Sequence, residues 1–346
     1  MQCSSDEPAT ADNRSVKMDN LLVLPSPQTQ DANVTIADWV ELTSMFSTDG
    51  GTSREDVIRA VCRDSDLSDV QAESLGNDVF KELADRLTSC MKAGPTLSSG
   101  YPFVLERNDT YLRLHEPGPA RRWERGFIYL FLLLVTRASM SSTERTMEGI
   151  DPTRTFEQLC ADVLAAFWGG VSDHSGAMVF GTSSRPSGSA KSFRSKIQTL
   201  CESLGEGEGW KDGAVAPGGG DGKLDIVAWR RFRDGRMGGL VGFAQCKTGN
   251  SWDKHLTQLN PKTFCRNYMK QALVLEPVRI YMVPNRISLQ VWESHTSDGG
   301  ILFDRCRILQ YAHPVNNKVL EHLRRWMTAA VAKQQKLMRR NRRRSQ

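Results

Sequence analysis

The sequence lacks the segments that would direct a protein into or across a membrane. Residues 1–20 have no apolar core of the kind that a secretory signal needs, and they are typical of a polar, flexible lead-in. The longest apolar run, residues 127–135, lies between Arg125 and Arg137 and is far shorter than the ~20 residues that cross a bilayer as a helix. We therefore expect a cytoplasmic protein without membrane contact, in which this run forms a buried helix.

The sequence is also poor in recognisable metal, nucleotide and covalent-catalysis motifs. Its eight cysteines are scattered, with no CxxC pair and no His/Cys spacing typical of zinc sites, which favours reduced thiols. There is no HExxH, no glycine-rich loop followed by GK[ST] and no GxSxG. These absences argue against a zinc protease, a P-loop nucleotide hydrolase and a serine hydrolase.

What is present is the composition of an ordinary folded protein with a mild basic excess. The 346 residues are 39% hydrophobic and 25% charged, and the formal net charge is +5. This length suggests two domains. We predict a mostly helical domain over residues 21–150, an α/β domain with a mixed sheet over 151–315, and a basic C-terminal helix or tail over 316–346.

The first predicted domain gives no indication of chemistry. Residues 35–90 have a helical apolar pattern, with Ser53 or Thr52 available as a helix cap. The alternating segment around Asn108 and Asp109 predicts a β-hairpin. Helices followed by a hairpin fit either a winged-helix DNA binder or a helical packing or interaction domain, and the domain could act as a sensor or bind a partner.

The second predicted domain alternates helices and strands. We expect helices over residues 156–168, 192–204 and 262–275, and strands over 177–182, 224–230, 240–247 and 278–283, with shorter strands at 287–292 and 301–309. A glycine-rich loop leads to Gly222. This order favours an α/β fold with helices flanking a sheet of roughly four or more strands.

Three chemically useful side chains converge in this domain. Asp225 begins one predicted strand, a DGRMGG turn follows, and Gln245 and Lys247 end the next strand. Residues two apart in a strand point to the same face, whereas Cys246 points to the other. If the two strands pair antiparallel about the turn, Asp225 lies beside Gln245 and Lys247.

These groups suit metal-assisted hydrolysis of a phosphodiester. The Asp225 carboxylate, the Gln245 amide oxygen and the Cys246 backbone carbonyl are oxygen ligands of the kind that Mg²⁺ takes, and Mn²⁺ would substitute. Lys247 would orient the attacking water or neutralise developing charge.

The segment resembles the PD-(D/E)xK nuclease superfamily, specifically its Mrr-like branch, in which the third motif reads QxK. The resemblance covers about residues 153–283: FEQLCADVL resembles the leading helix with its acidic residue at Glu157, DGKLD resembles the metal-binding motif at Asp225 with an accessory Asp221, and AQCK matches QxK. It implies a restriction-endonuclease-like core and a metal site that also includes Glu157 and Asp221. The helical insertion and long glycine-rich loop before Asp225 depart from the simplest members and leave the choice of substrate open.

Basic residues in two regions suggest contacts with a phosphate backbone. On the insertion and beyond the QxK motif we expect DNA contacts from Lys191, Arg194, Lys196 and Lys254. The C-terminal segment ends with five more candidates, Arg339, Arg340, Arg342, Arg343 and Arg344. A solvated tail that only raises solubility is the alternative for that segment.

The sequence therefore predicts a Mg²⁺-dependent endonuclease acting on DNA, and the resemblance implies a role in bacterial restriction or defence against phage. A homodimer and an activating partner protein of a defence system are both compatible with it. Two alternatives stay open: a non-catalytic nucleic-acid-binding or scaffold subunit that keeps the fold, and a structure-selective enzyme of the Holliday-junction resolvase type.

Overall fold

The computed structural model describes residues 21–91, 100–115, 124–138, 144–180, 193–217, 222–249 and 251–344. Three parts of the sequence-based predictions lie outside these residues: the lead-in 1–20, Asp221 and Lys191. Within the described residues the chain is a mixed α/β protein, as the sequence predicts.

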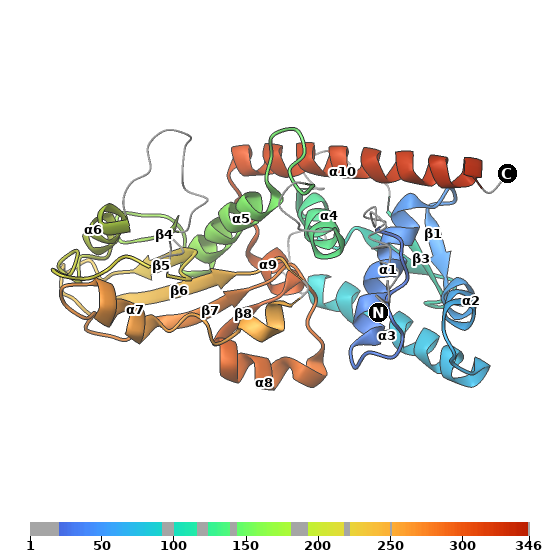
Figure 1. The fold of residues 1–346 in the computed structure, drawn as a ribbon, viewed down its shortest axis with the longest axis horizontal. Helices are drawn as coiled ribbons and strands as arrows, with labels where there is room; N and C mark the ends of the chain where they lie inside the picture. The colour runs from blue at the N-terminus through green and yellow to red at the C-terminus, as the bar shows by residue number, and fades with distance from the viewer. Residues whose placement is uncertain are drawn as a thin grey trace, which may run out of the picture.

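The N-terminal part combines helices with a small sheet of three antiparallel strands in the order β1-β3-β2 (Figure 1). Its elements are α1 (Ala32–Phe46), β1 (Gly51–Ser53), α2 (Arg54–Asp64), α3 (Asp69–Met91), β2 (Phe103–Glu106), β3 (Tyr111–Leu114) and α4 (Glu124–Arg137). The predicted hairpin is confirmed as β2 and β3, joined by a turn in which Asn108 and Asp109 have positive φ. Ser53 caps α2 through a capping box with Asp56, also as expected.

Strand β1 was not predicted, because three residues are too few to show an alternating pattern. It pairs with β3, with Gly51 opposite Arg113. A Cβ on Gly51 would lie 2.3 Å from the hydroxyl oxygen of Tyr111, so the close packing of this ring on the strand requires glycine.

The C-terminal part is built on a five-stranded sheet in the order β4-β5-β6-β7-β8. Strands β4, β5 and β6 are antiparallel, and β7 and β8 continue in parallel with β6. Its elements are α5 (Pro152–Phe167), β4 (Ser175–Val179), α6 (Phe193–Leu204), β5 (Ile226–Arg230), β6 (Leu240–Cys246), the 3₁₀ turn η3 (Trp252–His255), α7 (Pro261–Tyr268), β7 (Val278–Met282), α8 (Leu289–Gly299), β8 (Ile301–Phe303), α9 (Arg305–Tyr311) and α10 (Asn317–Arg344).

Both faces of this sheet are covered, because its central strands are apolar on both sides. Ile226 and Ala244 join the larger core with α5 and the N-terminal helices. Val227 and Phe243 point the other way, into a second core with α6 and α7. Helix α10 packs on α5 and α4 and extends over the N-terminal part (Figure 1).

Three predicted elements differ from the structure, one in type and two in extent. The segment 287–292 is not a strand: Ser288 accepts a hydrogen bond from the Gln290 amide and starts α8. The segment 301–309 is a strand only to Phe303, after which Asp304 caps α9. The helix predicted to run to residue 275 ends at Tyr268. In the first two cases a capping side chain outweighs the β-branched residues that favoured a strand.

The hydrophobic core extends across the domain boundary predicted near residue 150. One cluster contains buried side chains from α1, α3 and α4 together with Phe156 of α5 and Phe303 of β8. The predicted buried helix is α4, in which residues 128–135 are almost completely inaccessible. No described helix is long and apolar enough to cross a membrane.

Candidate functional site

Asp225 and β6 meet at the end of the β5–β6 ladder, as the sequence predicts. Ile226 is paired with Ala244, and the Asp225 amide donates to the Ala244 carbonyl at 3.0 Å. Beyond that point the Asp225 side chain continues the contact, because its Oδ2 accepts a hydrogen bond from the Cys246 amide at 2.8 Å. Asp225 is 9% exposed, and this hydrogen bond holds its carboxylate beside the QxK segment.

Gln245 has a buried side-chain amide whose nitrogen and oxygen differ in their contacts. The side chain is 1% exposed, and its Nε2 donates to Oε1 of Gln258 at 3.3 Å. Its own Oε1 is inaccessible and has no hydrogen-bond partner within the described part of the chain. A buried carbonyl oxygen without a partner costs free energy, so it marks a position where an additional ligand would be stabilising.

Cys246 points to the opposite face of β6, toward α5. Its thiol is hydrogen-bonded to the thiol of Cys160, and burial raises the pKa of both groups. The negative charges of Asp225 and Glu157 raise these pKa values further. Both cysteines are therefore thiols at neutral pH, and neither is an activated nucleophile.

Glu157 lies in the second turn of α5, not in the first turn as the sequence suggested. The helix begins at Pro152 after Asp151, whose carboxylate accepts a hydrogen bond from the Thr153 amide and caps it. A carboxylate this far from the helix start gains little from the helix dipole. The helix dipole therefore does not account for a carboxylate at this position, and the role of Glu157 at the metal site stays a prediction.

Lys247 follows β6 directly and is half-buried. Its amide donates to the Met282 carbonyl at 3.0 Å, which extends the parallel pairing with β7 by one residue. The backbone position of Lys247 is thus fixed by the sheet. The strand alternation assigns its side chain to the face of Asp225 and Gln245.

The residues described do not include any group of three His, Cys, Asp or Glu side chains that could hold a metal. The ligand set expected from the sequence draws on other oxygens as well, namely the Gln245 amide and the Cys246 carbonyl. Asp225 and the unpartnered Gln245 oxygen are hard donors that fit Mg²⁺ or Mn²⁺. The roles of the Cys246 carbonyl and of Asp221 stay predictions.

The expected DNA contacts near the site are only in part at the surface. Arg194 and Lys254 are exposed. Lys196, in contrast, is buried, and its ammonium donates to the Phe180 carbonyl at 2.9 Å. The prediction that Lys196 contacts DNA from the surface is therefore wrong, because α6 directs this side chain inward against the end of β4.

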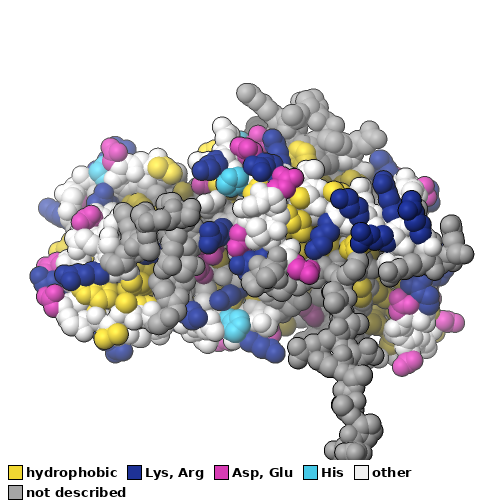
Figure 2. All heavy atoms as spheres, turned by 45° about the horizontal axis from the view of Figure 1, so that its top comes forward, with side chains coloured by type: hydrophobic (Ala, Val, Ile, Leu, Met, Phe, Trp, Pro, Cys, Tyr) yellow, Lys and Arg dark blue, Asp and Glu magenta, His cyan; other side chains and the backbone are white. Residues whose placement is uncertain are grey.

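The basic C-terminal segment is a continuous helix, α10. Arg339, Arg340 and Arg343 are exposed, whereas the side chains of Arg342 and Arg344 lie outside the described set. Figure 2 shows Lys and Arg side chains gathered on the side of the molecule where α10 lies.

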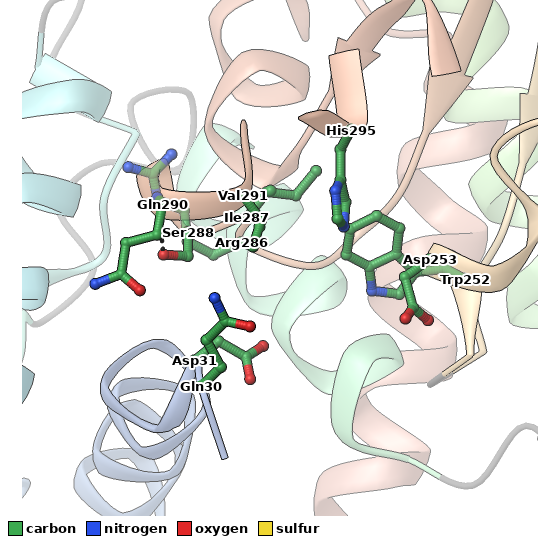
Figure 3. A pocket seen from close by; sticks show the side chains of 10 residues that line it. All are labelled: Gln30, Asp31, Trp252, Asp253, Arg286, Ile287, Ser288, Gln290, Val291 and His295. Carbon is green, nitrogen blue, oxygen red and sulfur yellow. Dashed lines mark hydrogen bonds between the residues drawn. The ribbon is translucent and has the colours of Figure 1, made fainter. Parts of the chain in front are cut away.

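A separate cavity of about 330 Å³ lies where α1 and α8 begin (Figure 3). Trp252 and His295 line it as an edge-to-face pair with ring centroids 5.3 Å apart. Asp31 and Asp253 also line it. Arg286 lines the cavity as well, so its wall carries charges of both signs.

Sequence reasoning does not assign a role to two residues that the structure places beside Gln245. Gln258 contacts Gln245, and its Nε2 lies 2.7 Å from Nδ1 of His255. Both lie more than seven residues beyond the QxK motif in an irregular segment, where spacing carries little information. The only sequence signal was the nearness of His255 to Lys247.

No protein family, no curated protein and no solved structure matches this chain.

Proposed function

We propose that this protein is a metal-dependent endonuclease that hydrolyses phosphodiester bonds of DNA. One observation carries the proposal: Asp225 is held beside β6, where the buried Gln245 amide presents an oxygen without a hydrogen-bond partner in the described residues. A carboxylate oxygen and an amide oxygen without a hydrogen-bond partner, side by side at the same edge of two adjacent strands, are two of the oxygen ligands that a hard cation needs.

The order of elements supports the resemblance to PD-(D/E)xK nucleases. Glu157 comes from the helix that precedes the sheet, Asp225 from the beginning of β5, and Gln245 and Lys247 from the end of β6. The first three strands form an antiparallel unit, and α7 connects β6 to the parallel strand β7. We infer a restriction-endonuclease-like core from this agreement between motif order and strand order.

The residues of the site would have different roles in the reaction. A bound Mg²⁺ or Mn²⁺ would lower the pKa of water and stabilise negative charge on the phosphate. Asp225 and Gln245 would hold this cation, with Glu157 acting directly or through water. Lys247 would orient the attacking water or neutralise charge that develops on the phosphate.

The charge distribution favours DNA contact through the C-terminal part. Residues 21–115 contain 8 Lys or Arg against 15 Asp or Glu, whereas residues 116–346 contain 35 against 21. The N-terminal helices and three-stranded sheet are compatible with a winged-helix arrangement, but α3 begins with Asp69 and exposes Glu73 and Asp78. Because such a helix repels phosphates, we assign DNA binding to α10 and the nuclease part. The N-terminal part would then be the sensor or the partner-binding part.

We propose that the protein acts in bacterial restriction or defence against phage, in the cytoplasm. A homodimer or a partner protein would supply the second site that double-strand cleavage needs. These proposals rest on the resemblance alone.

The test is cleavage of supercoiled plasmid, linear duplex and branched DNA by purified wild type and Lys247→Ala, with Mg²⁺, Mn²⁺ or EDTA. We expect metal-dependent cleavage that the substitution abolishes. Preference for branched DNA would instead indicate a resolvase. Tight DNA binding without cleavage of any substrate would contradict the proposal and favour a non-catalytic subunit.

A further inference from the structure

The segment between β6 and α7 holds a short chain of hydrogen bonds that ends at the Gln245 amide. Nε2 of Gln245 donates to Oε1 of Gln258 at 3.3 Å, and Nε2 of Gln258 lies 2.7 Å from Nδ1 of His255. The backbone N–H of Gln258 also donates to the backbone carbonyl of His255 at 3.2 Å, so one turn of the backbone holds the two residues together.

The amide orientations in the structure give this chain one direction. An amide nitrogen only donates, so in this orientation Nδ1 of His255 accepts the hydrogen bond from Gln258. The side-chain oxygen of Gln258 then faces Gln245, and the NH₂ group of Gln245 donates a hydrogen bond to it. With Gln258 in this orientation, a reversed Gln245 amide would set two oxygens against each other. The oxygen of Gln245 is therefore the end left without a hydrogen-bond partner among the described residues.

The hydrophobic core also holds this chain of hydrogen bonds in place. Leu256 and Leu259, on either side of Gln258, are buried at 5% and 1% exposure. Gln258 itself is exposed, and His255 is half-buried. Anchored neighbours reduce the freedom of Gln258, so its contact with Gln245 is preorganised and does not form only when a ligand arrives.

We propose that Gln258, backed by His255, is a positioning residue that turns the Gln245 amide so that its oxygen, not its nitrogen, meets a divalent cation. This inference rests on the proposed function, because it assigns an outer contact to the same cation site. Residues that orient ligands in this way commonly contribute a factor of about 10–100 to metal affinity.

The experiment measures Mn²⁺ binding by calorimetry without DNA. It compares wild type, Gln258→Leu and Asp225→Asn. Gln258→Leu removes both contacts of the chain, and we expect Mn²⁺ affinity about 10–100 times weaker. Gln335→Leu makes the same chemical change at an exposed position of α10 and should leave the affinity unchanged.

Two further variants separate positioning from a general structural effect. Gln258→Glu keeps an oxygen facing Nε2 of Gln245 and should restore affinity to within about tenfold of wild type. If His255 acts only through Gln258, the double variant His255→Leu, Gln258→Leu should bind no more weakly than Gln258→Leu alone.

The outcomes distinguish this inference from the proposed function. If Asp225→Asn abolishes Mn²⁺ binding while Gln258→Leu binds like wild type, the positioning role is refuted and the cation site stands. If Gln258→Glu binds as weakly as Gln258→Leu, the oxygen contact is not what matters and the positioning role is refuted as well. If wild type binds no Mn²⁺, both the positioning role of Gln258 and the proposed cation site are refuted.

Discussion

Arg305 donates to both carboxylate oxygens of Asp38, at 2.8 and 3.0 Å, and so joins α9 to α1. Arg86 of α3 donates to the same carboxylate at 2.7 Å and pairs with Glu41 at 3.0 Å. All four side chains are buried. The N-terminal helices are thus attached to the sheet part by ion pairs shielded from water as well as by the shared hydrophobic core.

Asp38→Asn should destabilise the protein by about 3 kcal/mol, because it removes one of the two carboxylates that the buried guanidinium groups share and leaves only Glu41 between them. Urea unfolding followed by circular dichroism measures this change. Glu106→Gln is the matched control, since its ion pair with Arg113 lies at the surface and should contribute about 1 kcal/mol or less. Equal effects of the two substitutions would show that the buried cluster is not a main attachment.

The same cluster predicts a dependence of stability on pH. Burial alone would raise the pKa of Asp38, but Arg305 and Arg86 outweigh it and lower the pKa from 3.8 to about 2. The folded protein therefore binds this proton less readily than the unfolded chain. The contribution of Asp38 is fully present above about pH 4 and is lost as the pH falls through about 2.

The free energy of unfolding should accordingly fall more steeply between about pH 4 and pH 2 in wild type than in Asp38→Asn. Urea titrations at several pH values give both curves. Curves that run parallel through this range would mean that the pKa of Asp38 is the same in the folded and unfolded states.

The exposed arginines of α10 should contribute to DNA affinity through counterion release. Arg339→Ala combined with Arg340→Ala should weaken binding of a duplex and reduce the slope of log K against log salt by about 0.9 for each phosphate that the variant no longer neutralises. Fluorescence anisotropy over a range of salt concentrations measures the slope. Arg59→Ala combined with Arg63→Ala, in the acidic N-terminal part, should leave it unchanged; an equal decrease for both pairs would argue against binding along α10.

The sequence predicts the parts of this protein whose pattern is local and regular. The hairpin at Asn108 and the antiparallel meeting of Asp225 with the QxK strand follow from alternation and a short turn, and the structure confirms both. The register follows because a shift of one residue would move Val227 and Phe243 out of their core.

Other features depend on contacts between distant segments, which no local pattern encodes. Lys196 looks like a surface base in sequence, but it is buried because its helix packs on the end of β4. The pairing of Asp38 with Arg305 joins residues 267 positions apart. Gln258 reaches Gln245 across an irregular segment, so neither hydrophobic period nor motif spacing indicates it.

The most direct test of the central claim is the single-turnover rate of DNA cleavage by wild type and Asp225→Asn, with Mg²⁺ restored after EDTA. Asparagine keeps an oxygen for the Cys246 amide, so the local fold should persist while the charge that holds the cation is removed. We predict Mg²⁺-dependent cleavage by wild type and a decrease on the order of 1,000-fold in the variant. Cleavage by Asp225→Asn at the wild-type rate would contradict the assignment of this site.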